Sequence, residues 1–578
     1  MSKLNVDQKT IFDLLADKKS DFLIPDYQRP YAWDEEQCQT LWDDIYTFAL
    51  PNNNHEEFDE SEEYFLGSIV TFKNEEGRLE VIDGQQRLTT LMLILRAFYD
   101  KFANTQDTNS RLTREKIEKC IWKTDIFGTA DKGTLKIDSE VATDNDKEEF
   151  LELLRSGIIP EKSRSQYVIN FKFFKTKIDE FSSKAPSSFA YLPARILGNC
   201  ILLPIEAESQ DTALRIFSTL NDRGLPLSDA DIFKAQFYKH YSEAGQKDWF
   251  IEEWRGLEDI TSKIFHPTSG APMDELFTRY MYYLRAKEGN KKTTTEALRK
   301  FFERDRYKYL KEDSTIDNLK SLALFWENVA RQNKEVFTEI ILKKLFILNY
   351  APNGMWQYIT SVYYLSNKDE NGLLDNYKFL TFLDKITAFI FAYAVTNPGV
   401  NALRTPVYAE MINIIKGSDV NFAEFKFNEV QVRSFFENYK FTNLRPITRS
   451  LLTWYAYTFE AQVLLDINET FELEHIYSKK RQEMEKGLTN PANLESLGNK
   501  VLLEESINIK ASDYRFEDKK KIYSSEMRRG KNKEKCKISE INEYIIKRDN
   551  FDENDIIERS KIILNSFFDF LDKEYLFS

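Results

Sequence analysis

The chain has 578 residues and a formal net charge of −14, with 42% apolar and 30% charged residues. This length exceeds what one hydrophobic core organises, so we expect two to four domains. The composition excludes a largely disordered chain, and the acidic balance argues against a protein that coats nucleic acid without specificity.

The beginning of the chain and its cysteines predict a cytoplasmic protein. The first residues lack the apolar core of a signal peptide, and the 4 cysteines show no paired or metal-ligand spacing. The longest apolar runs, at 91–95 and 386–395, are shorter than the roughly 20 residues that a membrane-spanning helix needs. We therefore expect a reducing compartment and no membrane partner.

Four regions follow one another along the chain. Residues 1–100 combine short β-like runs at 64–72 and 79–82 with a helix, which predicts an α/β core. Residues 101–245 are mainly helical, with a strand at 201–205 and a capped helix start at Ser228. Residues 246–465 show helical spacing throughout and no clustered acids or metal-type spacing.

We expect that third region to be an all-helical spacer that couples the regions on either side. Residues 466–578 return to a mixed pattern of strand, loop and helix. The predicted fold class is therefore α+β and predominantly helical.

A polar turn joins a strand to a helix at Asp83-Gly84-Gln85-Gln86-Arg87. A helix N-terminus presents unpaired N–H groups, glycine permits close backbone approach, and arginine can form a fork onto phosphate oxygens. These features predict an anion site. On spacing alone, an ordinary capped helix with a surface arginine remains the simpler interpretation.

Two further polar clusters accompany this turn, at 24–33 with Arg29 and at 217–224 with Arg223. Together the three clusters resemble the GmrS-type module, the N-terminal part of the GmrSD modification-dependent (type IV) restriction enzymes, over residues 10–245. The resemblance implies a core similar to the ParB and sulfiredoxin fold and a site that binds and hydrolyses a nucleoside triphosphate. The nucleotide-site residues that it implies are Asp83, Gly84, Gln85, Gln86 and Arg87. We add Arg29 and Arg223, for which a structural role that ties loops together is the alternative.

His475 stands apart from the other three histidines, His55, His240 and His266. It lies in an alternating, strand-like run at 471–477, which is followed by Asn499, Asn508 and a helical segment at 516–523. Phosphodiester hydrolysis needs a base that activates water and a divalent ion that stabilises the developing charge.

His475 suits the base, and Asn499 suits a role in orienting it. Glu474 and Asn508 suit the ligation of Mg²⁺ or a similar ion. A packed structural histidine is the simpler alternative.

Residues 466–578 resemble the GmrD-type nuclease domain, which has the HNH, or His-Me finger, ββα-metal fold. The order and spacing of the histidine and the asparagines carry this resemblance. The chain departs from the family at Ser478, where proline is common, and at Lys500, where leucine is common. Neither position supplies the base or a ligand.

The region from 475 to 550 is basic, with 18 Lys and Arg against 13 Asp and Glu. The excess includes the cluster at 528–533. A DNA-binding face and a solvated loop both fit this pattern.

These features favour an NTP-regulated, modification-dependent DNA endonuclease that acts on phage DNA and can form a homo-oligomer. A phosphorothioate-sensing nicking enzyme that shares both modules is the second hypothesis. The third is an NTPase sensor whose HNH-like segment has become a scaffold. The sequence does not separate the first hypothesis from the second.

Overall fold

The computed structural model describes residues 5–6, 8–105, 107–141, 144–210, 212–213, 216, 228–267, 271–399, 401–524 and 536–578. The chain divides into two compact units, Met1–Arg255 and Gly256–Ser578, which we describe separately. Arg223 and the clusters at 217–224 and 528–533 lie outside the described residues, so nothing tests those predictions.

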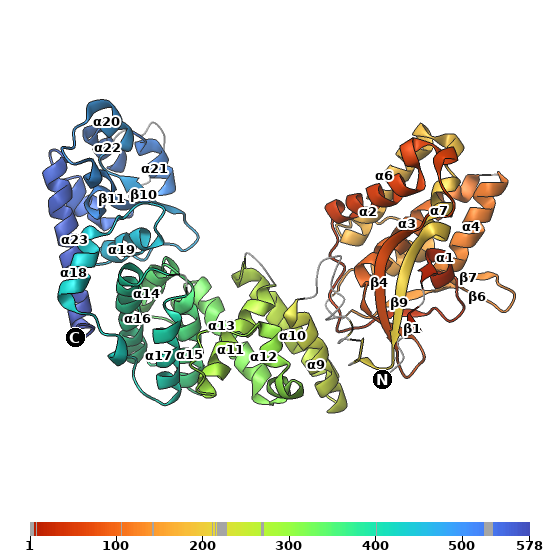
Figure 1. Cartoon of the computed structure of the whole chain (residues 1–578), viewed down its shortest axis with the longest axis horizontal. Helices are drawn as coiled ribbons and strands as arrows, with labels where there is room; N and C mark the ends of the chain where they lie inside the picture. The colour runs from red at the N-terminus through yellow and green to blue at the C-terminus, as the bar shows by residue number, and fades with distance from the viewer. Residues whose placement is uncertain are drawn as a thin grey trace. The chain divides into compact units, whose positions relative to one another are not determined.

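A mixed sheet forms the centre of the first unit, with the strand order β1-β9-β4-β5-β3-β8 and β2 also paired to β9 (Figure 1). These strands are Asn5–Val6 (β1), Lys9–Thr10 (β2), Phe22–Ile24 (β3), Tyr64–Lys73 (β4), Leu79–Asp83 (β5), Ile137–Ser139 (β8) and Cys200–Ala207 (β9). The strands predicted at 64–72, 79–82 and 201–205 are therefore confirmed. β4 is parallel to β9 and antiparallel to β5, and β3 is parallel to both β5 and β8.

Helices cover this sheet and complete the first unit. They are Ile11–Leu15 (α1), Glu35–Ala49 (α2), Gln85–Lys101 (α3), Thr108–Ile121 (α4), Lys147–Ser156 (α5), Gln166–Lys184 (α6), Tyr191–Asn199 (α7) and Asp229–Glu243 (α9). Every residue of α3 from Gln85 to Tyr99 is buried, because this helix packs against α4, α5 and α6 and shares one hydrophobic core with Ile69 and Val81 of the sheet. The predicted helix start at Ser228 is confirmed by a capping box with Asp231.

A separate hairpin, Trp122–Thr124 (β6) and Ala130–Leu135 (β7), interrupts the region that the sequence predicts as mainly helical. The prediction missed this hairpin because its outer strand is largely exposed and carries no alternating apolar pattern.

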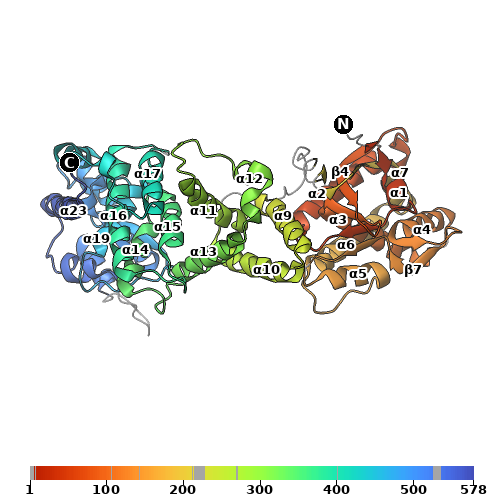
Figure 2. The same ribbon diagram turned by 90° about the horizontal axis from the view of Figure 1, so that it is seen from below.

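The second unit begins with a helical region. Lys247–Ile264 (α10) crosses the boundary between the units, and the helices that follow are Pro272–Lys287 (α11), Leu298–Phe302 (α12), Ser314–Ala330 (α13), Glu339–Asn349 (α14), Met355–Asn367 (α15), Asn376–Thr396 (α16), Arg404–Ile415 (α17), Glu429–Asn438 (α18) and Pro446–Ala456 (α19). All the regular elements that the structure describes between 247 and 456 are helices, as the sequence predicts. Helices α14 to α17 lie in one bundle in both views (Figure 1 and Figure 2).

α16 is long and apolar enough to cross a membrane by length and composition. Most of its apolar window is buried inside the protein, where α16 packs against α14, α18 and α19. It is therefore the central core helix of this bundle.

The end of the chain folds around a two-stranded antiparallel ladder. Phe471–His475 (β10) pairs with Lys500–Glu504 (β11), which confirms the predicted strand at 471–475. The accompanying helices are Lys479–Glu485 (α20), Glu505–Ala511 (α21), Phe516–Tyr523 (α22) and Glu553–Lys573 (α23). The whole chain is thus α+β and predominantly helical.

Candidate functional site

A glycine turn joins β5 to α3 in the first unit. Gly84 has φ +87°, in the left-handed region, and a Cβ placed there would lie 3.0 Å from the Ser68 carbonyl oxygen. Because only glycine adopts this conformation without strain, the strand can pass directly into the helix. Gln85, Gln86 and Arg87 are consequently buried at the helix start.

Arg87 lies against the backbone of β4. Its Nη1 donates to the Ser68 carbonyl oxygen at 2.9 Å. Gly67 has φ +115°, and a Cβ there would lie 2.9 Å from the Arg87 guanidinium carbon. Gly67 therefore makes room for Arg87, a role that the sequence did not reveal because Gly67 lies in β4 and Arg87 in α3.

The Asp83 carboxylate lies near two guanidinium groups. Burial raises the pKa of Asp83, while the Gly84 N–H, Arg87 and Arg29 act in the opposite direction. The structure thus brings Asp83, Arg87 and Arg29 together, as the prediction of a shared site requires. Whether they bind a nucleotide stays a prediction.

Glutamine side chains hold the segment at 24–33 against this turn. Gln86 Oε1 accepts from the Ala32 backbone N–H at 2.7 Å, and its Nε2 donates to the Pro30 carbonyl oxygen at 3.1 Å. Gln28 Nε2 donates to the carbonyl oxygens of Val81 at 3.2 Å and Ile82 at 3.1 Å. Two of the three motifs are therefore one hydrogen-bonded structure.

A cavity of about 500 Å³ adjoins this segment. Its acidic lining residues are Asp26, Glu75, Glu76, Glu80, Glu140 and Glu208. Lys247 pairs with Asp26 at 2.6 Å, and Tyr27 donates to Glu80 at 3.3 Å. None of the residues at 83–87 lines this cavity. Because an acidic lining repels phosphates, this cavity does not favour the binding of a nucleotide.

His475 ends β10 in the second unit. Its side chain is 11% exposed, and its Nε2 has no hydrogen-bond partner within the described part of the chain. The nearest carboxylate oxygen, from Glu495, is 3.7 Å away. Burial, followed by the charge of Lys500, lowers the pKa of His475 to about 4, although Glu495 opposes the shift. The imidazole is therefore neutral at pH 7, with an acceptor nitrogen available.

Glu495 is a member of this site that the sequence did not reveal. Lys479 Nζ lies 2.5 Å from one of its oxygens, and Lys500 Nζ lies 2.6 Å from the other. Burial raises the pKa of Glu495, but the two lysine hydrogen bonds outweigh burial and lower that pKa to about 2. The departure at Lys500 was the signal, because a fully buried lysine needs an acidic partner.

Asn499 fastens the chain on either side of the ladder. Its Oδ1 accepts from the Tyr477 backbone N–H at 2.8 Å, and its Nδ2 donates to the carbonyl oxygens of Tyr477 at 3.0 Å and Leu494 at 2.9 Å. The fully buried amide therefore fixes the turn that follows His475. This geometry suits an orienting role.

Gly498 and Arg559 hold the same loop from the side of α23. A Cβ on Gly498 would lie 1.9 Å from the Ile556 carbonyl oxygen, so the loop and the helix backbone are in direct contact. Arg559 Nη1 donates to the carbonyl oxygens of Leu497, Gly498 and Lys500 at 2.7 to 3.0 Å. The position of the loop is thus fixed by α23.

The two expected metal ligands have different surroundings. Glu474 Oε1 accepts from Lys519 Nζ at 2.6 Å and from the Tyr523 hydroxyl at 2.8 Å, and all three side chains are buried. Asn508 lies half-buried on α21. Among the described residues, no group of three or more His, Cys, Asp or Glu side chains is placed to hold a metal ion. In this arrangement Lys519 neutralises the Glu474 carboxylate, so a cation would bind Glu474 only after that ion pair opens.

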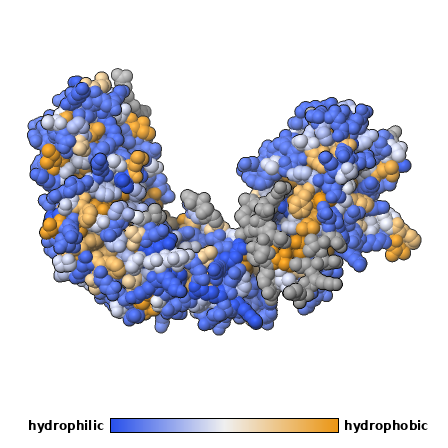
Figure 3. Space-filling view, in the orientation of Figure 1, coloured by the Kyte–Doolittle hydropathy of each residue, from blue (hydrophilic) through white to orange (hydrophobic). Residues whose placement is uncertain are grey.

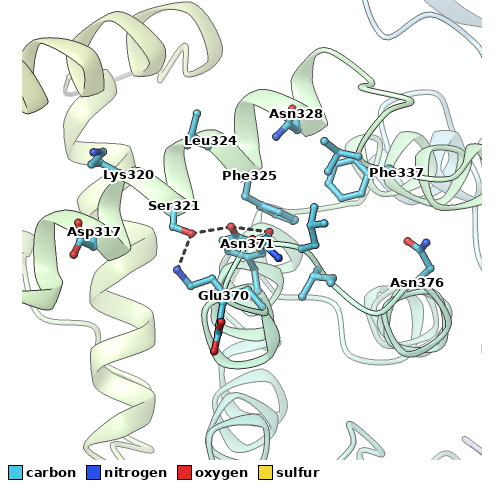
Figure 4. Close-up of a pocket in the computed structure, with 16 residues that line it drawn as sticks. Asp317, Lys320, Ser321, Leu324, Phe325, Asn328, Phe337, Glu370, Asn371 and Asn376 are labelled. Carbon is cyan, nitrogen blue, oxygen red and sulfur yellow. Dashed lines mark hydrogen bonds between the residues drawn. The ribbon is translucent and has the colours of Figure 1, made fainter.

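The helical region of the second unit contains a cavity of about 400 Å³ between α13 and the loop after α15 (Figure 4). Lys368 Nζ donates to Ser321 Oγ at 2.7 Å, Ser321 lies 2.8 Å from the Tyr364 hydroxyl, and Tyr364 donates to the Gly372 carbonyl oxygen at 3.2 Å. This chain links the two helices and the loop. His266 is exposed at the end of α10 and belongs to no such cluster.

Family comparisons match both ends of the chain. Residues 11–238 match the N-terminal domain of the GmrSD restriction endonuclease, and residues 428–566 match the C-terminal domain of GmrSD restriction endonucleases. The chain belongs to the GmrSD restriction endonuclease family. The turn at 83–87 lies in the GmrSD N-terminal domain, and His475 lies in the C-terminal domain. A GmrSD restriction endonuclease acts on DNA in defence, so DNA is the substrate class. A comparison with curated proteins finds no match.

Proposed function

We propose that the protein is an NTP-regulated, modification-dependent DNA endonuclease of the type IV restriction class, and that its natural target is modified phage DNA. The observation that carries the nuclease assignment is the buried His475 Nε2, which is neutral at pH 7 and has no partner in the described chain. A general base needs such a nitrogen.

The C-terminal domain is proposed to be a nuclease of the HNH type. A paired β10 and β11 followed by α21 and α22 supports a ββα arrangement. His475 Nε2 takes a proton from water, the water oxygen attacks the phosphorus, the ester P–O bond to the leaving oxygen breaks, and that oxygen takes a proton from solvent. Lys479, whose side chain is 52% exposed, can contact a phosphate oxygen of the bound strand. Asn499 keeps the His475 turn in place throughout.

A divalent cation remains part of the proposal, with Glu474 and Asn508 as its oxygen ligands. It would stabilise the charge on the phosphate. Its binding requires the Glu474–Lys519 ion pair to open, so no step above depends on it. Cleavage that stops in chelator and returns with Mg²⁺ would support the cation, whereas cleavage that is indifferent to chelator would remove it from the proposal.

The N-terminal domain is proposed to bind and hydrolyse a nucleoside triphosphate on a ParB- and sulfiredoxin-like core. Asp83, Arg87 and Arg29 lie together at a helix start, where backbone N–H groups and arginine favour phosphate. Gln86 and Gln28 connect this point to the segment at 24–33. Nucleotide binding can therefore change the position of that segment.

The deciding experiment incubates the purified protein with NTP and Mg²⁺ on plain, glucosyl-hydroxymethylated and phosphorothioated DNA. We expect NTP-dependent cutting of the glucosylated DNA. Nicking of the phosphorothioated DNA alone would support the nicking enzyme. NTP hydrolysis without any cutting would support the sensor, for which the Glu474–Lys519 ion pair is the favouring observation.

A further inference from the structure

The β6–β7 hairpin of the N-terminal domain ends in an exposed apolar tip. Ile126 is 81% exposed and Phe127 is 86% exposed, next to each other in the turn. In Figure 3 an orange projection marks the right edge of the molecule, where Figure 1 places this hairpin. Two neighbouring large apolar side chains with this exposure need an explanation, because keeping apolar surface in contact with water costs free energy.

The tip is held in one conformation. The Asp125 carboxylate accepts from the backbone N–H groups of Phe127 at 2.9 Å and Thr129 at 2.8 Å. Gly128 takes φ +83°, and Lys18 Nζ donates to the Ile126 carbonyl oxygen at 3.2 Å. At the base of the hairpin Trp122 is fully buried. The side chains are therefore presented by a preformed support, so little ordering entropy opposes their insertion into a partner.

The surroundings of the hairpin are basic in an acidic protein. From 108 to 136 the chain has 7 Lys and Arg against 4 Asp and Glu. The acids of this stretch have internal partners: Glu115 pairs with Arg111 and Glu118 with Lys132, while Asp125 and Asp131 accept from turn N–H groups. Four exposed lysines on this hairpin's neighbouring elements make no ion pair within the described chain: Lys18, Lys19, Lys116 and Lys119. Unpaired lysines match phosphates.

We propose that Ile126 and Phe127 form a wedge that enters between base pairs of duplex DNA when the N-terminal domain binds its target. The lysines around the hairpin contact the flanking phosphates and hold the duplex in register. Apolar wedges of one or two such side chains partly unstack a base step and kink the duplex. The proposal rests on DNA as the substrate of the family, and on neither the nucleotide nor the nuclease assignment.

The size of the tip separates DNA from a protein partner. A stable protein interface buries about 1,200–2,000 Å². Two residues at the end of a narrow hairpin cannot provide that area, and a lysine, Lys18, donates to the tip backbone from outside the hairpin. A base step, in contrast, accepts one or two side chains. A second copy of the chain is therefore the alternative that the experiment must detect.

The test measures binding to short duplexes, plain and glucosyl-hydroxymethylated, each carrying a single 2-aminopurine that is moved along the sequence. In chelator, the wild-type protein should raise 2-aminopurine emission at one position. The Ile126→Ser, Phe127→Ser double variant should bind about tenfold more weakly and lose the rise in emission, because stacking on the wedge is absent. Phe127→Trp should retain both.

Two controls isolate the wedge. Ile158→Ser removes a side chain that is 68% exposed in the same domain, and it should change neither readout. Lys19→Gln with Lys119→Gln should weaken binding and lower its salt dependence by about 0.9 per lost phosphate contact, yet leave the emission rise in bound DNA, because neither side chain bonds to the hairpin tip in the described chain.

Three results would overturn the proposal. If the wild type binds DNA and the double serine variant keeps the same affinity and the same rise in emission, the wedge is excluded but the proposed function stands. No DNA binding by the wild type would remove both. Sedimentation that shows a wild-type dimer dissociated by the serine changes would identify the tip as a self-association surface.

Discussion

Buried polar groups differ in their hydrogen-bond partners between the two sites of this chain. Around Asp83–Arg87, the amides of Gln86 and Gln28 bond to neighbouring backbone, and Arg87 donates to a β4 carbonyl oxygen. At His475 the buried Nε2 has no partner in the described chain. In the hydrogen-bonded cluster around Asp83–Arg87, a displacement of one glutamine would break several bonds. The neutral imidazole of His475 keeps one lone pair for a proton from water, and its lowered pKa makes it a weak base.

The largest expected effect is on DNA cleavage at the unsatisfied site. His475→Ala should slow cleavage ~10²–10⁴-fold, because the general base is lost, and should leave nucleotide hydrolysis unchanged. Single-turnover gel assays of modified DNA measure the first rate, and phosphate release measures the second. His55→Ala is the matched control, since His55 bonds to Ser188 in the other domain. Wild-type cutting by His475→Ala would contradict the HNH proposal.

Arg87→Ala tests the proposed nucleotide site at Asp83–Arg87. Loss of a charge-assisted contact should lower nucleoside triphosphate turnover about 10- to 100-fold, with the fold retained. Isothermal titration with NTP and a phosphate-release assay measure the effect. Arg155→Ala, an exposed arginine of the same domain, should leave turnover unchanged. Normal turnover in Arg87→Ala would mean that the turn is only structural.

Gly498→Ala asks whether α23 really sets the catalytic loop. The new methyl group would meet backbone of α23, which cannot yield like a flexible side chain, so we expect a loss of about 3 kcal/mol in the free energy of unfolding and weak cleavage. Gly256→Ala is the control, because nothing lies within 4 Å of its Cβ position. Equal stability of the two variants in urea would show that the loop is free to move.

In the first unit the sequence predicts the longer strands β4, β5 and β9, but not β1, β2, β3 and β8, which are too short to show an apolar pattern. The site is less predictable. Glu495 and Lys479 meet His475 only through the fold, and Gly67 of β4 lies against Arg87 of α3. Lys519 lies 45 residues beyond Glu474, so spacing gives no sign that it occupies the expected ligand. The β6–β7 hairpin was missed because its outer strand is mostly polar.

A pH profile sharpens the comparison further. The pKa of His475 is about 4, below its ordinary value of 6.5, so the base stays neutral from about pH 6 to 8 and cleavage should not vary with its titration there. The same shift lowers stability as pH falls from 6.5 toward 4, because the unfolded chain then binds a proton that the folded chain excludes. A cleavage inflection near pH 6.5 that His475→Gln removes would show that the imidazole is solvated.

The smallest expected effect concerns the helical region between the two sites. His266→Ala should leave cleavage, hydrolysis and thermal stability within error of the wild type, because this exposed side chain belongs to no described cluster. Loss of cleavage with normal folding would reveal a site in this region.

The central claim is that the two domains perform separate reactions, and one paired measurement tests it most directly. NTP hydrolysis and single-turnover cleavage of the same glucosyl-hydroxymethylated duplex are followed in His475→Ala and in Arg87→Ala. We predict that His475→Ala hydrolyses NTP at the wild-type rate without cutting, and that Arg87→Ala loses hydrolysis together with NTP-dependent cutting. Cleavage at the wild-type rate by His475→Ala, or loss of hydrolysis in that variant, would contradict the account.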